Sequence, residues 1–238
     1  MITAEQEREI SLYLLGKNLP MDLVLEVKDH MVEQIDYKIN NDNKTFDIAF
    51  LETKQDWNRD LQLKFSFWAK EKRTRLHIKT IKNTYNKFLT ISLKWFLPII
   101  LTSIIFLLFN KSFAYYFILI ANIIAFLFAL IILIKDYKII KTSNYYYRKK
   151  ISYLQGGLNI IRLTVMYIPI YLLNGYDNKF EKYYKASIDI IHLNFNIRGI
   201  LSFSIFYIFI WGTILGILYY IEYKKTITDL QKRINLKL

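Results

Sequence analysis

Four side chains that could hold a divalent metal ion lie close together near the N-terminus, namely Glu26, Asp29, His30 and Glu33. Residues three and four apart share one face of a helix, so this group could present two or three ligands. The same pattern more often forms an exposed charged face, and no second cluster of such side chains follows. We therefore expect no metal ion or other cofactor, and interpret Glu26, Asp29 and Glu33 as an acidic face that binds a protein partner.

Other candidates for catalysis are isolated. Asp189 and His192 are three residues apart, a relation found in metal and acid–base sites, but two residues make a poor site. The absence of cysteine excludes thiol catalysis and disulfide bonds. The pair Gly156-Gly157 lacks the lysine and the strand–helix context of a phosphate-binding loop. We therefore predict no catalytic residue and a non-enzymatic protein.

Arg162 is the most unusual charged residue, because it interrupts the apolar run 151–173. An arginine in mid-membrane is costly unless it is paired or reached by water, which makes it a functional candidate. The other polar residues that counting places near the same depth are Asn122, Thr102, Ser103 and Thr213. We expect Arg162 to face the bundle interior and to bond Asn122 or the adjacent Thr and Ser hydroxyls, pinning helices or lining a polar path. The alternative is a third span that is shifted or lies in the interface, with the arginine in water.

The elements that carry these residues are predicted from composition and hydropathy. The chain has 238 residues and a net charge of +13. Its hydrophobic fraction of 53% is too high for an ordinary soluble domain with that charge. A helix of about 20 residues crosses the hydrocarbon of a bilayer. Four apolar runs reach this length, and they predict a transmembrane domain over 91–221 with spans at 91–109, 113–134, 151–173 and 199–221.

Gly212 and Gly216 lie four residues apart in the fourth predicted span. Small residues at this spacing let two helices approach closely in a membrane. The contact is either within the bundle or between subunits of a homo-oligomer.

Charge is distributed unevenly along the chain. Residues 1–63 hold thirteen acidic and seven basic side chains, a net charge of −6, and the remainder carries +19. Basic residues concentrate in 64–90, in 135–150 and in the tail 222–238. The positive-inside rule therefore predicts a multi-pass membrane protein with both termini in the cytoplasm. Because the positive charge flanks apolar runs, we expect no nucleic-acid binding.

Residues 1–63 are predicted to form an acidic three-helix domain. Thr3 and Gln6 form a capping box at the start of the first helix, and Pro20 suits the first turn of the second. Apolar residues recur every four positions along this second helix, at Leu23, Val27, Met31 and Ile35. Thr45 is predicted to cap the third helix. The apolar side of that helix consists of Phe46, Phe50, Trp57 and Leu61.

Residues 64–90 are predicted to form a basic amphipathic linker helix. Eight Lys and Arg residues face a single acid, Glu71, with aromatic and aliphatic residues between them. Such a helix either binds the anionic lipids of a leaflet or continues the third helix in solvent.

The first quarter of the chain resembles HAAS-like or permease-prefix domains, small helical cytoplasmic domains at the N-termini of bacterial membrane proteins. The residues that carry the resemblance are Leu19-Pro20, Glu26, Asp29-His30, Phe46, Ala49-Phe50 and Trp57. The whole chain looks like membrane proteins of Bacteroidetes-type bacteria that carry such domains. These domains are commonly encoded beside PadR-type transcriptional regulators or attached to permease subunits. The resemblance therefore implies a cytoplasmic protein partner, and it supplies no catalytic residue.

The sequence as a whole predicts an all-α protein, with a small cytoplasmic three-helix domain followed by a four-helix transmembrane bundle. The leading hypothesis is a non-enzymatic protein of the bacterial inner membrane, a sensor or anchor whose N-terminal domain binds a cytoplasmic partner such as a transcriptional regulator. The alternative is a transporter or permease subunit that places Arg162 on a polar path.

Overall fold

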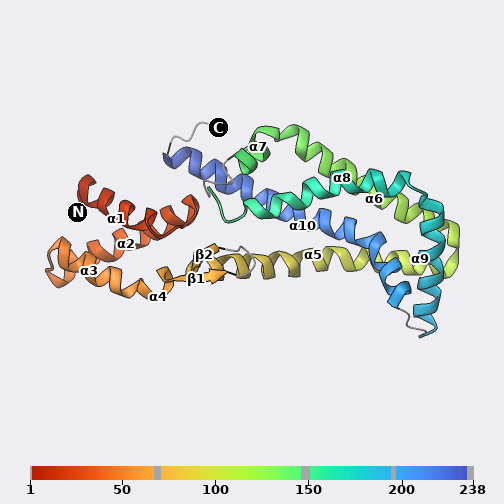
Figure 1. Ribbon diagram of the computed structural model, residues 1–238, viewed down its shortest axis with the longest axis horizontal. Coiled ribbons are helices and arrows are strands. Elements are labelled where there is room, and N and C mark those ends of the chain that lie inside the picture. The colour runs from red at the N-terminus through yellow and green to blue at the C-terminus, as the bar shows by residue number, and fades with distance from the viewer. Residues whose placement is uncertain (1, 67–70, 146–150, 194–196, 235–238) are drawn as a thin grey trace. The chain divides into compact units, whose positions relative to one another are not determined.

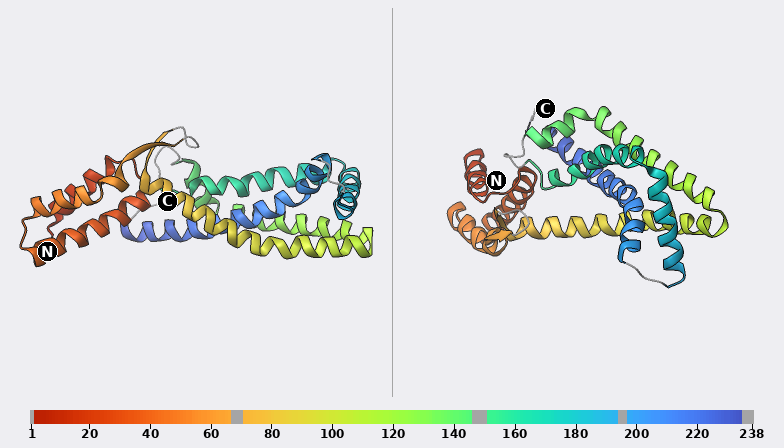
Figure 2. Two further views of the ribbon diagram at one scale, coloured as in Figure 1. Left: turned by 90° about the horizontal axis from the view of Figure 1, so that it is seen from below. Right: turned by 45° about the vertical axis from the view of Figure 1, so that its right-hand side comes forward.

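The structure is a computed structural model that describes residues 2–66, 71–145, 151–193 and 197–234 (Figures 1 and 2). The described chain is helical apart from one short hairpin, as the sequence predicts for an all-α protein. Its contacts divide it into two compact units. Unit 1 consists of Met1–Tyr85, Asn144–Gln155 and Thr226–Lys237, and unit 2 of Asn86–Ser143 and Gly156–Lys225, with Leu238.

The first helix of unit 1 begins and ends where the sequence predicts. In α1 (Ala4–Leu15) the Thr3 hydroxyl accepts a hydrogen bond from the Gln6 N–H at 3.3 Å, and the Gln6 side chain accepts one from the Thr3 N–H at 2.8 Å. This reciprocal pair satisfies two N–H groups that the helix itself cannot. Gly16 stands at the C-terminal cap, so the predicted first helix is confirmed.

Three further helices follow α1 in unit 1. α2 (Met21–Asp42) starts directly after Pro20, and α3 (Phe46–Asp56) starts after Thr45. Thr45 stands at the N-cap of α3 with an extended backbone, but its side chain forms no capping hydrogen bond with the described residues. The short α4 (Asn58–Leu61) completes the domain.

The core of unit 1 lies between α1, α2 and α3. The predicted stripe of α2 is buried in full, with Leu23, Val27, Met31 and Ile35 at most 2% exposed. Ile10, Leu14 and Phe50 pack against this stripe. Trp57 is only half-buried, and its indole N–H donates to Gln34 Oε1 at 2.8 Å. Apolar periodicity therefore identified the core correctly, while Trp57 lies at its edge.

The linker 64–90 is not one helix. β1 (Leu63–Ser66) pairs with β2 (Glu71–Thr74) as an antiparallel hairpin, and only then does α5 (Arg75–Phe109) begin. Apolar and polar residues alternate along β1, a period of two that suits a strand better than an amphipathic helix. The Thr74 hydroxyl accepts from the His77 N–H at 3.2 Å and so caps the start of α5.

Unit 2 is built from long helices. α6 (Lys111–Lys135) is followed by the shorter α7 (Tyr137–Tyr145), and α8 (Asn159–Leu173) is preceded by a 3₁₀ turn at Gln155–Leu158. α10 (Ile197–Ile234) is the last helix and continues into unit 1. α6 packs along α8, and its buried side chains are Ala114, Ile118, Asn122, Ala125 and Ala129.

Three helices within the described residues are long and apolar enough to cross a membrane: Arg75–Phe109, Lys111–Lys135 and Gln155–Leu173. The first two contain the predicted spans 91–109 and 113–134. The third starts at Gln155, because residues 151–154 are not helical and belong to unit 1. The fourth predicted span, 199–221, falls inside α10 and stays a prediction.

The predicted outer loop contains a helix that the sequence analysis did not identify. α9 (Tyr176–Ile191) runs across the end of unit 2, at a steep angle to α8 (Figures 1 and 2). One side of α9 is buried in an apolar cluster with Leu107 of α5 and Ile118 of α6. This loop is therefore a packed part of unit 2.

Candidate functional site

The first turn of α2 binds the segment 151–155, which precedes α8 in the chain. The Asp22 N–H donates to the Ile151 carbonyl at 3.1 Å, and the Asp22 carboxylate accepts from the Tyr153 N–H at 3.3 Å. The same carboxylate also accepts from the Leu23 N–H at 2.8 Å. Ile151 and its neighbours at 152 and 154 are buried. A loop more than a hundred residues away is therefore part of the N-terminal domain.

The environment of Asp22 makes its charge sensitive to pH near neutrality. Burial raises the pKa of Asp22 to about 6, and the nearby Glu26 carboxylate acts in the same direction. Hydrogen bonds from Ser152, Leu23 and Tyr153 lower the pKa and are outweighed. The contact between α2 and the segment 151–155 therefore contains a group that titrates in the physiological range.

The predicted acidic face lies on α2, and the C-terminal tail occupies part of it. Glu26 and Glu33 are exposed, as the sequence predicts for a partner-binding face. Asp29 forms an ion pair with Arg233, with 2.6 Å between the guanidinium nitrogen and the carboxylate oxygen. Arg233 also pairs with Asp229 one turn earlier in α10, at 3.0 Å. The face thus binds a guanidinium group within this chain.

The residues considered for a metal site do not form one in the described part of the chain. There, no group of three or more His, Cys, Asp or Glu side chains is placed to hold a metal ion. His30 Nδ1 lies 4.0 Å from Glu33 Oε2, and both side chains are mainly exposed. Asp189 and His192 are exposed at the C-terminal end of α9.

Arg162 does not lie where the sequence analysis placed it. Its guanidinium donates to the Ile140 carbonyl at 2.6 Å and to the Ser143 hydroxyl at 2.7 Å, both on α7, and to Asn159 Oδ1 at 2.9 Å. The prediction counted depth from residue 151, whereas the helical span starts at Gln155. Seven residues at about 1.5 Å each place Arg162 about 10 Å into the helix, four residues closer to its N-terminal end than the prediction had it.

The other residues of the predicted polar layer are not joined to Arg162. Asn122 donates to the Ile118 carbonyl at 2.9 Å, and its Oδ1 accepts no hydrogen bond from the described residues. The Thr213 hydroxyl bonds the Phe209 carbonyl at 2.8 Å in its own helix. Thr102 is partly exposed, and Ser103 belongs to another cluster. The predicted layer linking Arg162 to Asn122 is therefore wrong.

A buried group of hydroxyls joins three helices in unit 2. The Ser103 hydroxyl of α5 bonds the Tyr207 hydroxyl of α10, which in turn lies 2.7 Å from the Tyr183 hydroxyl of α9. The Ser187 hydroxyl donates to the Tyr183 carbonyl one turn along α9. The sequence signal that would have identified this group is the three- and four-residue spacing of aromatic residues along 176–187.

A second polar cluster ties the end of α6 to α10. The Lys224 ammonium lies 2.9 Å from an Asp136 oxygen, and the Tyr220 hydroxyl donates to the same carboxylate. The hydrogen bond from Tyr220, followed by the Lys224 charge, lowers the pKa of Asp136 despite partial burial. Nothing in the sequence pairs these residues, which are about eighty positions apart.

The small residues of α10 serve packing inside unit 2. A Cβ atom on Gly216 would lie 2.7 Å from Ile161 Cγ1 of α8, and one on Gly212 would lie 3.7 Å from Ile160. Of the two contacts predicted for this glycine pair, within the bundle or between subunits, the close approach of α8 and α10 is the one within the bundle.

Comparison with protein-family models, with curated proteins and with solved structures finds no match to this chain. The resemblance of the first quarter of the chain to permease-prefix domains therefore stays a prediction. The function is inferred from the contacts of the described residues.

Proposed function

We propose that the protein is a non-enzymatic, four-span membrane protein of the bacterial inner membrane, whose N-terminal helical domain binds a cytoplasmic protein partner. The membrane helices anchor this domain and relay a change in the membrane to it, or the reverse. A transcriptional regulator is the partner class that the resemblance implies.

The composition of unit 1 carries this proposal. Three separate segments of the chain meet in it: the N-terminal domain, the segment Asn144–Gln155 and the tail Thr226–Lys237. The second segment leads directly into α8, and the third continues α10. A displacement of either helix along its axis would therefore pull on the N-terminal domain through the contacts of Asp22 and Asp29.

The same composition supports the proposed topology. Segments that pack in one compact unit must lie on the same side of a membrane. Between the N-terminal domain and residue 144 lie α5 and α6, so these two helices would cross and return. Between residues 155 and 226 lie α8 and α10, so if α8 crosses, α10 must cross back. An even number of spans with both termini in the cytoplasm agrees with the positive-inside rule.

The chemistry of the acidic face indicates what the partner presents. Glu26 and Glu33 are open to solvent, and Asp29 holds the guanidinium of Arg233. Carboxylates on one helix face bind Arg or Lys side chains, with Arg favoured where two hydrogen bonds can form. We therefore infer a partner with a basic docking surface, which competes with Arg233 for Asp29.

The alternative function, a transporter that uses Arg162 on a polar path, loses the contact on which it depended. Arg162 bonds α7 and its own helix, and Asn122 Oδ1 accepts nothing from it. No contact of the described residues favours transport over anchoring.

The test is recovery of the intact protein from its native membrane in mild detergent, with identification of the proteins that accompany it. Glu33→Lys should lose the partner, whereas Glu9→Lys, the same charge change at an exposed site on α1, should retain it. Loss of the partner in both variants, or retention in both, would show that the acidic face is not the docking surface. Recovery of an ATPase in place of a regulator would favour a permease subunit.

A further inference from the structure

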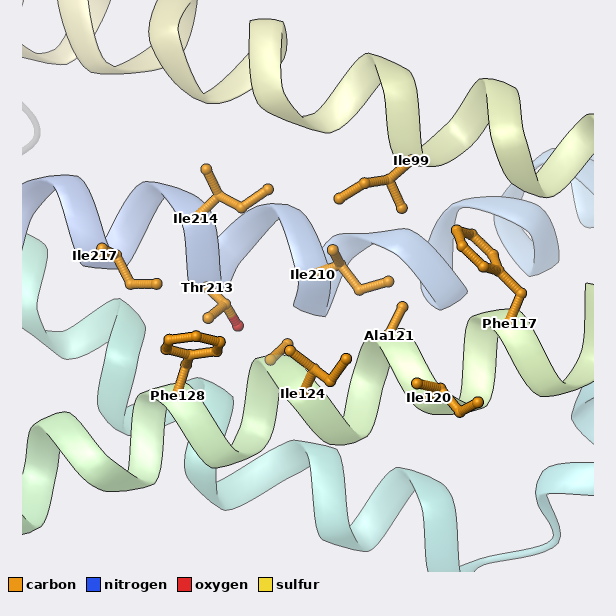
Figure 3. Close-up of a pocket in the computed structure, with 11 residues that line it drawn as sticks. Ile99, Phe117, Ile120, Ala121, Ile124, Phe128, Ile210, Thr213, Ile214 and Ile217 are labelled. Carbon is orange, nitrogen blue, oxygen red and sulfur yellow. The ribbon is translucent and has the colours of Figure 1, made fainter.

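The surface of α6 changes from hydrocarbon to positive charge at its C-terminal end. No charged side chain occurs from 112 to 134, a length of about 33 Å at 1.5 Å per residue. Figure 3 shows Phe117, Ala121 and Phe128 of this helix along the wall of an apolar groove. α6 is long and apolar enough to cross a membrane, and a hydrocarbon core about 30 Å thick would then end close to Lys135.

The short helix α7, which follows α6, is held to α8 and α10 by polar contacts. Arg162 of α8 donates to the Ile140 carbonyl at 2.6 Å and to the Ser143 hydroxyl at 2.7 Å. The Thr142 hydroxyl lies 3.4 Å from the Tyr223 hydroxyl of α10. The three α7 residues of these contacts are buried. One side of α7 is therefore fixed against the helices of unit 2.

The other side of α7 presents two lysines and a tyrosine to the outside. Tyr137, Lys138 and Lys141 are exposed, and they lie within about 100° of the helix circumference, away from Ser143. The Lys141 ammonium lies 6.0 Å from the centre of the Tyr137 ring. Tyrosine is enriched where a membrane protein meets the lipid headgroups, and lysine extends its ammonium group to the same level.

The acidic side chains at this end of unit 2 are matched by lysines of α10. α6, α7 and α8 contain no Asp or Glu. Asp136, which joins α6 to α7, lies 2.9 Å from the Lys224 ammonium. The part of α10 that belongs to unit 2 contains one acid, Glu222, and Lys225 follows it by three residues. A net charge of +3 therefore remains on the exposed lysines that follow the apolar span, which are Lys135, Lys138 and Lys141.

These lysines lie at headgroup level for any tilt of α7. Lys141 is six residues beyond Lys135, so at about 1.5 Å per residue the two backbone positions are at most about 9 Å apart. The headgroup layer is roughly 5–8 Å thick on each side of the hydrocarbon, and a flexible lysine side chain can extend toward it. The lysines can therefore meet the phosphate groups of the leaflet in which α6 ends.

We propose that α7 is an interfacial helix that binds the headgroup phosphates of anionic phospholipids through Lys135, Lys138 and Lys141. The occupant is a lipid headgroup because the face carries a net positive charge and an exposed aromatic ring directly after an apolar span. This inference rests on the membrane location in the proposed function, and it does not depend on the partner of the N-terminal domain.

The test is native mass spectrometry of the full chain released from nanodiscs of phosphatidylglycerol and phosphatidylcholine in equal amounts. The wild-type protein should retain phosphatidylglycerol in preference to phosphatidylcholine. Lys138→Gln combined with Lys141→Gln should lower this preference about tenfold or more, since each lysine near an anionic surface contributes about fivefold to binding.

Two matched double variants serve as controls. Lys182→Gln combined with Lys185→Gln removes two exposed lysines that are also three residues apart, on α9, and should leave the preference unchanged. Lys138→Arg combined with Lys141→Arg keeps the charge of α7 and should also keep the preference.

The outcomes separate this inference from the proposed function. A wild-type protein that does not enter the nanodiscs would refute the membrane location and this inference together. A protein that enters them without preferring phosphatidylglycerol, or whose preference is unchanged by the glutamine pair on α7, overturns this inference alone. Equal loss of preference in the α9 variant also overturns it. So does a dimer mass that the glutamine pair on α7 abolishes, because a second copy of the chain would then cover this face.

Discussion

Raising the pH from 5 to 7 should loosen the contact between the segment 151–155 and the first turn of α2. Burial raises the pKa of Asp22 in this contact to about 6, whereas an aspartate released into solvent titrates near 4. The protonated carboxyl is therefore favoured when the contact is closed. Stability of the contact is highest below about pH 4, where Asp22 is neutral in both states, and it is lost as the pH rises through 6.

The magnitude follows from the two pKa values. A difference of about 2 between them corresponds to roughly 3 kcal/mol over the full range. Between pH 5 and pH 7 the change is about 1.3 kcal/mol, which is about a tenfold increase in the population of the open contact. The Tyr153 N–H donates a hydrogen bond to Asp22, and opening of the contact exposes it to solvent. The protection of that amide against hydrogen exchange should therefore fall by the same factor.

Hydrogen exchange of the full chain in detergent measures this effect, once each rate is divided by the intrinsic exchange rate at the same pH. Asp22→Asn should abolish the pH dependence in peptides that cover 151–155. Asp29→Asn, a matched change two turns further along α2, should leave it in place. Equal protection at both pH values, or the same pH dependence in Asp22→Asn, would refute the assignment of the titration to Asp22.

Three further outcomes are expected. Gly216→Ala should lower the unfolding free energy by about 1–3 kcal/mol, because the new Cβ would lie 2.7 Å from an Ile161 carbon. The control Gly156→Ala places its Cβ where no atom lies within 4 Å, so it should change the unfolding free energy by less than about 0.5 kcal/mol. Arg162→Leu should cost about 2 kcal/mol in thermal or denaturant unfolding, since it removes the bonds to α7, and an unchanged transition would contradict that role. A reporter fused near Lys182 should lie in the periplasm and one near Ser143 in the cytoplasm, and a cytoplasmic signal at both would contradict the even-span topology.

Local features of the N-terminal domain were predictable because their causes are local. A capping box needs only Thr3 and Gln6 at the correct spacing. Apolar residues at every fourth position of α2 predict which side of that helix is buried. For the same reason, the apolar runs 91–109 and 113–134 predict that α5 and α6 contain stretches long and apolar enough to cross a membrane. The start of the linker 64–90 was misjudged because its basic and aromatic composition was given more weight than the alternation of apolar and polar residues along 63–66, which favours a strand.

The tertiary structure decided everything that depends on partners distant in the chain. The shift of the third span to Gln155 follows from the packing of residues 151–154 against α2, and that shift moves Arg162 out of the predicted layer with Asn122. The pairing of Asp136 with Lys224, and the meeting of Ser103, Tyr207 and Tyr183, link positions that no helical period relates. The sequence alone determined the helices α1 and α2 and which segments are apolar, because these depend on neighbours within one or two turns. Which polar group meets which was decided only when long helices packed side by side.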